Sequence, residues 1–218
     1  MKDIVIIGAG GLGRELLMLL HQLNEVSAQW NILGFYDDNT ALAGTYINNL
    51  PYLGTVKDLE KVQQELSVAL GIGSPQVKQQ LVARLQPLQN LTFPVLVHPS
   101  VSIKPYQFIH LGEGTVIGQG VVLTANITLG RHVFINLCCT IGHDACLADF
   151  VALMPGVNVS GATTLGEAVY MGTNAAVLQG IRVGAHTTVG AGAVVTTDLP
   201  AGCTAVGVPA KIIKKHEL

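Results

Sequence analysis

Two hydrophobic patterns divide the chain near residue 95. Before that point, short apolar runs alternate with segments whose apolar residues recur at helical spacing. The runs predict strands at 3–7, 32–36 and 68–72, and the helical spacing predicts helices at 14–23 and 75–85. Alternating strands and helices predict a small parallel sheet covered by helices, so we expect one domain at 1–95 and a second at 96–218.

The second pattern is a repeat of six residues. Every sixth position carries an aliphatic residue or methionine, and a glycine follows at many of them. These positions are Leu111, Ile117, Leu123, Leu129, Ile135, Ile141, Leu147, Leu153, Val159, Leu165, Met171, Val177, Val183, Val189 and Val195. Neither a flat strand nor a helix has this period, which predicts short strands joined by corners. Three hexads complete one coil, so stacked coils predict a parallel β-helix with these side chains inside.

Composition and charge narrow the class of protein. About half of the 218 residues are apolar, which is enough for a buried core. The 12 basic and 14 acidic residues form no basic stripe, which argues against a nucleic-acid partner. The apolar run 4–9 is too short for an export signal or a membrane span, and the four cysteines lack CxxC spacing. We therefore expect a cytoplasmic protein with reduced thiols and no membrane partner.

The segment 8–13, Gly-Ala-Gly-Gly-Leu-Gly, fits GxGxxG between a predicted strand and a predicted helix. Amide groups at such a helix start can hold a phosphate pair. Asp37 and Asp38 follow the next strand, where an acidic residue meets a ribose in dinucleotide sites. The motif alone favours NAD, but only one mononucleotide half fits before the repeat, and a single half can bind one nucleotide diphosphate. The alternative is that these glycines only permit tight packing of strand against helix.

His143 differs from the other six histidines by its position in the repeat. It lies two residues after the inward Ile141 and directly after the corner residue Gly142, where its side chain can leave the β-helix. Asp144 is adjacent, and a carboxylate on one imidazole nitrogen fixes the tautomer and raises the basicity of the other nitrogen. The pair is a candidate general base, and the alternative is a solvated pair at a turn.

The end of the repeat carries a more specific pattern. The segment 190–195, Gly-Ala-Gly-Ala-Val-Val, is followed by Asp198, Pro200 and the segment 206–211, Val-Gly-Val-Pro-Ala-Lys. With the glycine loop before it, the whole chain resembles the hexapeptide-repeat sugar acetyltransferases, which combine a Rossmann-like domain with a left-handed β-helix. This group includes N-acetyltransferases of UDP-4-amino sugars, perosamine enzymes and sialic acid O-acetyltransferases. The left-handed sense is implied by the resemblance and not by the period.

The resemblance implies two binding sites and a catalytic pair. The nucleotide-sugar residues it implies are Gly10, Gly11, Leu12, Asp37, Asp38 and Gly73. Those implied for acetyl-CoA are Gly161, Thr173 and Ala191, and His143 with Asp144 would be catalytic. Two positions depart from the family: Asp144 stands where many members have Glu, and Ala152 stands where some have a second histidine that helps to position acetyl-CoA.

The expected function is transfer of an acetyl group from acetyl-CoA to the amino group of a nucleotide-activated sugar, with a UDP-4-amino sugar as the first choice. The resemblance also implies a homotrimer whose active sites lie between subunits, and we expect no metal. Two other functions stay open. One is O-acetylation of a sugar such as sialic acid, and the other is a non-catalytic β-helix scaffold or nucleotide sensor.

Overall fold

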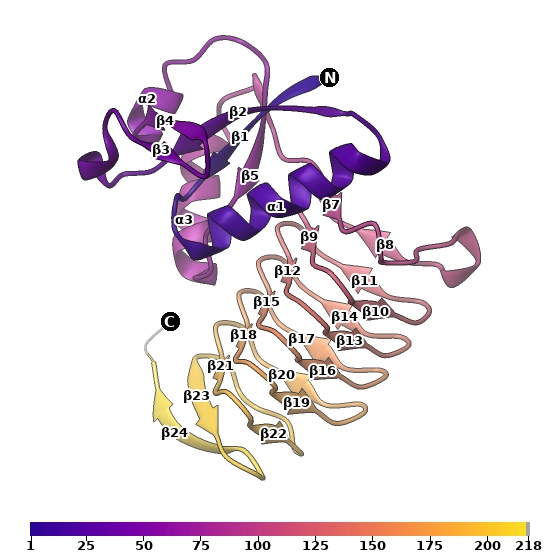
Figure 1. The fold of residues 1–218 in the computed structure, drawn as a ribbon. Coiled ribbons are helices and arrows are strands. Elements are labelled where there is room, and N and C mark those ends of the chain that lie inside the picture. Colours follow the sequence, from indigo (N-terminus) through magenta and orange to yellow (C-terminus); the bar gives the residue numbers. More distant parts are fainter. Residues whose placement is uncertain (217–218) are drawn as a thin grey trace. The chain divides into compact units, whose positions relative to one another are not determined.

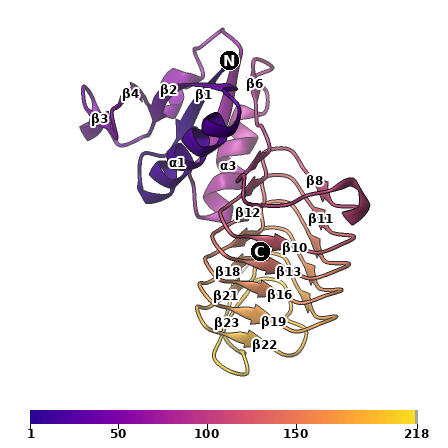
Figure 2. The ribbon, with the colours of Figure 1, turned by 45° about the vertical axis from the view of Figure 1, so that its right-hand side comes forward.

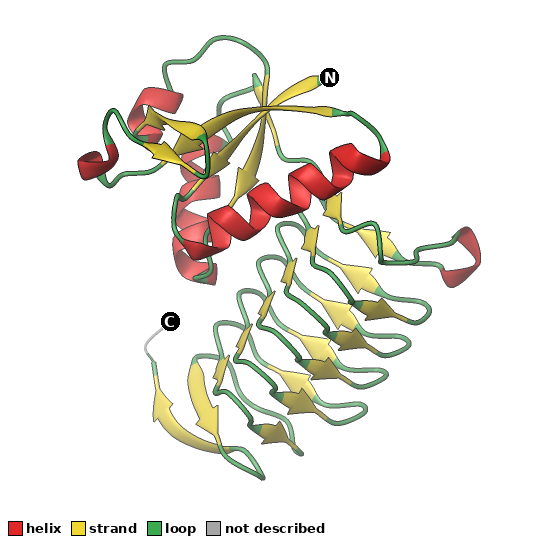
Figure 3. Ribbon diagram, viewed as in Figure 1, coloured by secondary structure: helices red, strands yellow, loops and turns green. Residues whose placement is uncertain are grey.

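The computed structural model describes residues 1–216, which form two compact units. The first comprises Met1–Gly73 and Val77–Leu96, and the second comprises Ser74–Gln76 and the described residues from Val97 onward. Figure 1 gives their elements and Figure 3 their helices and strands. Among residues 1–216, no helix is both long and apolar enough to cross a membrane.

A six-stranded sheet in the order β3-β4-β2-β1-β5-β6 forms the centre of the first unit. Its strands are β1 (Lys2–Ile7), β2 (Trp30–Tyr36), β3 (Tyr46–Ile47), β4 (Leu50–Gly54), β5 (Leu66–Leu70) and β6 (Leu91–Thr92). β1 pairs in parallel with β2 and β5, and Ile4, Val5 and Ile6 are fully buried, as a central parallel strand requires. β3 pairs antiparallel with β4 as a hairpin.

Three α-helices accompany this sheet in the described part of the chain: α1 (Gly11–Val26), α2 (Val56–Leu59) and α3 (Pro75–Leu85). A short 3-10 helix, η1 (Thr40–Leu42), follows β2. α1 packs its buried leucines, which include Leu16 and Leu20, against β1 and β2. The predicted helix at 75–85 coincides with α3, whereas α1 extends the predicted 14–23 at both ends.

The second unit is built from strands of two residues that repeat along the chain. They are β7 (Leu96–Val97), β8 (His110–Leu111), β9 (Val116–Ile117), β10 (Val122–Leu123), β11 (Thr128–Leu129), β12 (Phe134–Ile135), β13 (Thr140–Ile141), β14 (Cys146–Leu147), β15 (Ala152–Leu153), β16 (Asn158–Val159), β17 (Thr164–Leu165), β18 (Tyr170–Met171), β19 (Ala176–Val177), β20 (Arg182–Val183), β21 (Thr188–Val189) and β22 (Val194–Val195). A 3-10 turn, η2 (Pro105–Gln107), precedes β8.

These strands form three parallel sheets, one for each side of the coil (Figure 2). Leu129 pairs with Leu111 in the preceding coil and with Leu147 in the following coil. One coil therefore contains three hexads. A longer antiparallel pair, β23 (Cys203–Val206) and β24 (Lys211–Lys215), ends the described chain. The predicted fold class, a Rossmann-like sheet followed by a parallel β-helix, is confirmed.

The core of the β-helix contains two sets of inward residues, each of which forms one column on every side of the coil. The predicted sixth-position residues are all buried except Leu111, which is partly buried against the core at the first coil. The second set, which the repeat did not predict, stands two residues before the first. Its members, which include Val133, Cys139 and Ala145, are buried except Ile109 and Ile181, which are partly buried. Thr187 also belongs to this second set, and its hydroxyl donates to the Pro200 carbonyl at 2.7 Å. Polar residues occur in this second set where a carbonyl accepts their hydrogen bond.

Candidate active site

His143 and Asp144 lie at the corner between β13 and β14. The His143 Nδ1 atom is 2.8 Å from the Asp144 Oδ2 atom. Neighbouring side chains on a straight strand point to opposite faces, but Asp144 adopts a φ of 59°, and this left-handed residue bends the chain so that the two side chains meet. A carboxylate accepts hydrogen bonds, so Nδ1 carries the proton and Nε2 becomes the acceptor of the ring.

Hydrogen bonds from His143 and from Asn126 hold the pKa of Asp144 below its usual value. The carboxyl group is therefore ionised at neutral pH, as a partner of an imidazolium must be. Both side chains are open to solvent, with 56% of His143 and 54% of Asp144 exposed. A base at this corner can reach a substrate without any rearrangement of the coil.

Gly161 lies against the His143 ring from the next coil. A Cβ atom at Gly161 would stand 2.6 Å from His143 Nε2, so a residue with a side chain would displace the ring. The backbone joins the two coils at this corner, where the Ala162 amide donates to the His143 carbonyl at 2.7 Å. The sequence resemblance implied Gly161 as an acetyl-CoA residue, and the structure places it beside the His143 ring.

Thr173 and Ala191 lie together at a different corner of the β-helix. Both are exposed, and they occupy successive coils, since the Gly192 amide donates to the Thr173 carbonyl at 2.8 Å. Their corner precedes β19 and β22, whereas the corner of His143 and Gly161 follows β13 and β16. The face formed by β10, β13, β16, β19 and β22 therefore separates the two groups of predicted acetyl-CoA residues. Ala152 is fully buried on β15.

The first unit contains a cavity of about 330 Å³ at the carboxyl ends of its central strands. Its lining residues are Ile7, Gly8, Asp37, Asp38, Val56, Ile72, Val77, Gln80, Leu81 and Arg84. After β1, the chain adds β2 on one side of this strand and later adds β5 on its other side, so the strand order reverses at β1. Ligands of open α/β sheets bind at such a switch point, outside the carboxyl ends of the strands.

The glycines of the loop divide into two groups. A Cβ atom at Gly13 would stand 1.7 Å from the Gly8 carbonyl oxygen, and one at Gly8 would stand 2.7 Å from the Gly71 carbonyl oxygen, so these glycines permit tight packing. By contrast, apart from their chain neighbours and the backbone of α1 itself, no described atom lies within 4 Å of the Cβ positions of Gly10 and Gly11. The packing explanation accounts for the first group, and the second group leaves its backbone open to a ligand at the start of α1.

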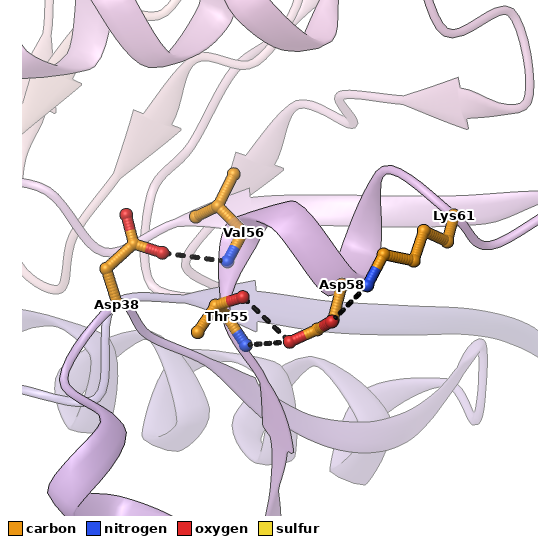
Figure 4. Close-up of polar contacts among 5 residues, drawn as sticks. All are labelled: Asp38, Thr55, Val56, Asp58 and Lys61. Atoms are coloured by element: carbon orange, nitrogen blue, oxygen red, sulfur yellow. Dashed lines mark hydrogen bonds and ion pairs between the residues drawn. The ribbon is translucent and has the colours of Figure 1, made fainter.

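The two neighbouring aspartates have different surroundings. Asp37 uses both carboxylate oxygens on the backbone, because Oδ2 accepts from the Ala9 amide at 2.7 Å and Oδ1 accepts from the Asn39 amide at 2.8 Å. Asp38 accepts from the Val56 amide through Oδ1 at 2.9 Å (Figure 4). Asp37 therefore fixes the glycine loop, whereas the second oxygen of Asp38 can serve a ligand.

The start of α2, which Asp38 contacts, is held by a capping box. The Asp58 Oδ2 atom accepts from the Thr55 amide at 3.1 Å and from the Thr55 hydroxyl at 2.7 Å (Figure 4). Lys61 Nζ donates to Asp58 Oδ1 at 2.7 Å. These hydrogen bonds, first those of Lys61 and then those of Thr55, hold the pKa of Asp58 far below its usual value. The wall of the cavity beside Asp38 is thus formed by an ordered turn.

Arg84 lines the cavity although the sequence analysis did not select it. It lies on α3 with Val77, Gln80 and Leu81, and its guanidinium pairs with Glu60. The spacing of these four residues along the helix is the signal that could have grouped them. Of the six nucleotide-sugar residues that the resemblance implied, Asp37 and Asp38 line this cavity. Its lining does not include Gly10, Gly11, Leu12 or Gly73, although Leu12 Cδ2 lies 3.9 Å from the Cβ position of Gly73.

Comparison with known proteins shows the family to which the chain belongs. Residues 3–85 match the family described as the PglD N-terminal domain. The acetyltransferase domain of PglB from Neisseria gonorrhoeae FA1090 is 31% identical, the match covers 98% of this chain and 100% of that chain, and the TM-score is 0.86. The chain belongs to the PglD-type hexapeptide-repeat sugar acetyltransferases. The resemblance stated from the sequence is confirmed.

Other members of this family also match over nearly the whole chain. PerB from Caulobacter crescentus, solved with CoA and GDP-perosamine, is 30% identical, with 98% of each chain covered and a TM-score of 0.87. WeeI from Acinetobacter baumannii AYE is 29% identical, with 98% of this chain and 100% of that chain covered and a TM-score of 0.86. The PglB domain has also been solved with acetyl coenzyme A.

A serine acetyltransferase from Buchnera aphidicola is a more distant kind of relative. It is 31% identical over 151 residues, which are 62% of this chain and 46% of that protein. The chain therefore spans about half the length of this curated relative.

Proposed function

We propose that this protein transfers an acetyl group from acetyl-CoA to the amino group of a nucleotide-activated sugar, with His143 as the general base. The observation that carries the proposal is the 2.8 Å hydrogen bond between His143 Nδ1 and Asp144 Oδ2 at an exposed corner. It leaves Nε2 as a proton acceptor beside Gly161. The relatives solved with acetyl coenzyme A, and with CoA and GDP-perosamine, support the choice of both substrates.

In the proposed reaction, the amine nitrogen of the sugar attacks the thioester carbonyl carbon of acetyl-CoA. His143 Nε2 accepts a proton from the amine as the new carbon–nitrogen bond forms. Asp144 stabilises the resulting imidazolium through Nδ1. The carbon–sulfur bond then breaks, and the imidazolium returns the proton to the CoA thiolate. The reaction needs no covalent enzyme intermediate.

The cavity of the first unit is proposed to hold the nucleotide. Gly10 and Gly11 expose the amide end of the 16-residue helix α1, which favours a diphosphate, and Asp38 has an oxygen for a ribose hydroxyl. Following the sequence resemblance, we propose UDP as the nucleotide and a 4-amino sugar as the acceptor. Cytoplasmic location and a homotrimer with active sites between subunits remain part of this proposal.

The test is turnover with a panel of acceptors. The purified protein is incubated with acetyl-CoA and with UDP-, dTDP- or GDP-linked amino sugars, and CoA release is followed. We expect turnover with at least one nucleotide amino sugar and none with the same nucleotide sugar that carries a hydroxyl in place of the amine. Turnover on free sialic acid without turnover on any amine would replace the proposal with O-acetylation.

Asp38 and Asp37 form a matched pair for testing the acceptor site. In Asp38→Asn, the amide oxygen of the new side chain would still accept from the Val56 amide, but the negative charge would be lost. This substitution is expected to raise the KM for the nucleotide sugar about tenfold, equivalent to about 1.4 kcal/mol. The KM for acetyl-CoA should not change. Steady-state kinetics with each substrate varied in turn measures both values.

Asp37→Asn is expected to act on stability instead. The new side chain would turn an NH₂ group toward the Ala9 or Asn39 amide, and a donor left without its acceptor costs about 1–3 kcal/mol. Thermal unfolding should show a lower Tm for this variant than for Asp38→Asn. Equal Tm values together with equal KM values would contradict the division of roles between the two aspartates.

A further inference from the structure

Asn126 contacts the catalytic pair from the preceding coil. Its Nδ2 atom donates to Asp144 Oδ1 at 3.1 Å, while Asp144 Oδ2 faces His143 Nδ1. Each oxygen of the carboxylate thus has its own partner. Two bonds that approach a planar group from different sides fix its rotation, which a single bond to His143 would leave open.

The Asn126 side chain projects from a fixed backbone. Its φ of 54° is left-handed, a conformation that asparagine tolerates better than most residues. The backbone amide of Asn126 donates to the Gln107 carbonyl at 2.7 Å. Gln107 in turn donates through Nε2 to the Leu123 and Thr124 carbonyls, both at 2.9 Å. The turn η2 and the first corner of the β-helix therefore hold Asn126 in place before any substrate binds.

The pair needs such support because it is exposed. A solvated ion pair contributes about 0–1 kcal/mol and samples several geometries, and more than half of the Asp144 side chain is exposed. Hydrogen bonds from His143 and from Asn126 are the main causes that lower the pKa of Asp144.

We propose that Asn126 is a positioning residue, which orients the Asp144 carboxylate and through it holds the His143 imidazole with Nε2 toward the substrate. The inference rests on the proposed function, because its kinetic tests require turnover. It adds Asn126 to the active site, although neither the position of His143 in the six-residue repeat nor the glycine loop indicates this residue. The bond from Asn126 to Asp144 is the contact that the experiments remove.

The first variant is Asn126→Gly, which removes the amide and keeps the left-handed backbone available. We expect kcat to fall about tenfold, with the KM of each substrate within about twofold of wild type. Asn48, another left-handed asparagine with a φ of 45°, lies in the turn between β3 and β4 and provides the matched control. Asn48→Gly should leave kcat unchanged. An Asn126→Gly variant with wild-type kcat would overturn the inference.

The second variant is Asn126→Asp, which has the same shape but changes the donor to a titratable acceptor. Two neighbouring carboxylates repel each other, and one of them binds a proton at a raised pKa. When the introduced carboxyl group is protonated, it could again donate to Asp144. The ratio of variant to wild-type kcat/KM should therefore rise from about pH 8 to about pH 5. A constant ratio would contradict a role that depends on this hydrogen bond.

A double-mutant cycle tests whether Asn126 acts through Asp144. If it does, Asn126→Gly combined with Asp144→Ala is no slower than Asp144→Ala alone. Multiplied losses would overturn the inference. If the wild type turns over no nucleotide amino sugar, the proposed function fails, but the positioning role can still be tested without substrate. The ¹⁵N NMR signals of His143, assigned with His143→Ala, should show a protonated Nδ1 in wild type and a tautomer mixture in Asn126→Gly, and identical spectra would overturn the inference.

Discussion

Replacement of His143 by alanine is expected to lower kcat about 10³-fold, within the range usual for loss of a general base. The amine would then have to lose its proton to water as it attacks the thioester. The KM values for acetyl-CoA and for the nucleotide sugar should stay within about threefold, because the exposed imidazole makes its contribution in the transition state. CoA release at saturating substrate measures the change.

A matched control for this substitution is His110→Ala. His110 is also exposed on the β-helix, and no carboxylate follows it in the sequence. We expect its kcat and Tm to equal those of the wild type. If His143→Ala retained kcat within threefold, the proton would have to leave through another group, and the proposed mechanism would be wrong even if the acceptor were correct.

The Gly161→Ala variant is expected to lose about 10²-fold in kcat with little change in Tm. The added Cβ would stand 2.6 Å from His143 Nε2, so the ring has to turn away. The ring lies at the end of an exposed side chain, and its displacement costs little stability. The displaced nitrogen no longer meets the amine, and misplacement by about 1 Å can cost a factor of 10².

Gly142→Ala is the comparison for this prediction. Its Cβ would stand 2.5 Å from the Gly161 backbone nitrogen, so the coils themselves would have to separate. We expect a clearly lower Tm for Gly142→Ala than for Gly161→Ala. A fully active Gly161→Ala enzyme would show that His143 does not accept the proton from its position beside Gly161.

Much of the β-helix could be predicted because each inward position follows a local rule. An aliphatic residue is required once in every hexad, and the chain satisfies this from Ile117 to Val195 without a gap, with Met171 as the one unbranched member. The second set of inward residues was missed because small and polar residues, such as Ala145 and Thr187, interrupt its aliphatic members. The residue type at each of these positions depends on the space between coils and on nearby carbonyl acceptors. A pattern of hydrophobic residues shows neither.

Short elements of the first unit were missed for a different reason. β3 has two residues and α2 has four, so neither is long enough to display a period. The turn between β3 and β4 depends on the left-handed Asn48 and Asn49, with φ values of 45° and 68°. A pair of asparagines permits such a turn but does not require one.

The sequence analysis selected the catalytic pair because His143 and Asp144 are neighbours along the chain. It did not select Asn126, whose contact with Asp144 exists only after the coils stack. Similarly, Asp37 and Asp38 read as equivalent in the sequence, whereas the backbone around Ala9 gives them different roles. Contacts between distant segments distinguish residues that look alike in a motif.

Because one coil contains three hexads, the effect of an insertion on the active site depends on whether it adds a single hexad or a complete coil. Adding one hexad between Asn126 and Asp144 would move Asn126 to another edge of the β-helix, because each hexad advances the chain by one side. Adding a whole coil after Val195 would lengthen the molecule and leave every contact of His143 intact. Such a scaffold can change its length only in complete turns if its chemistry is to survive.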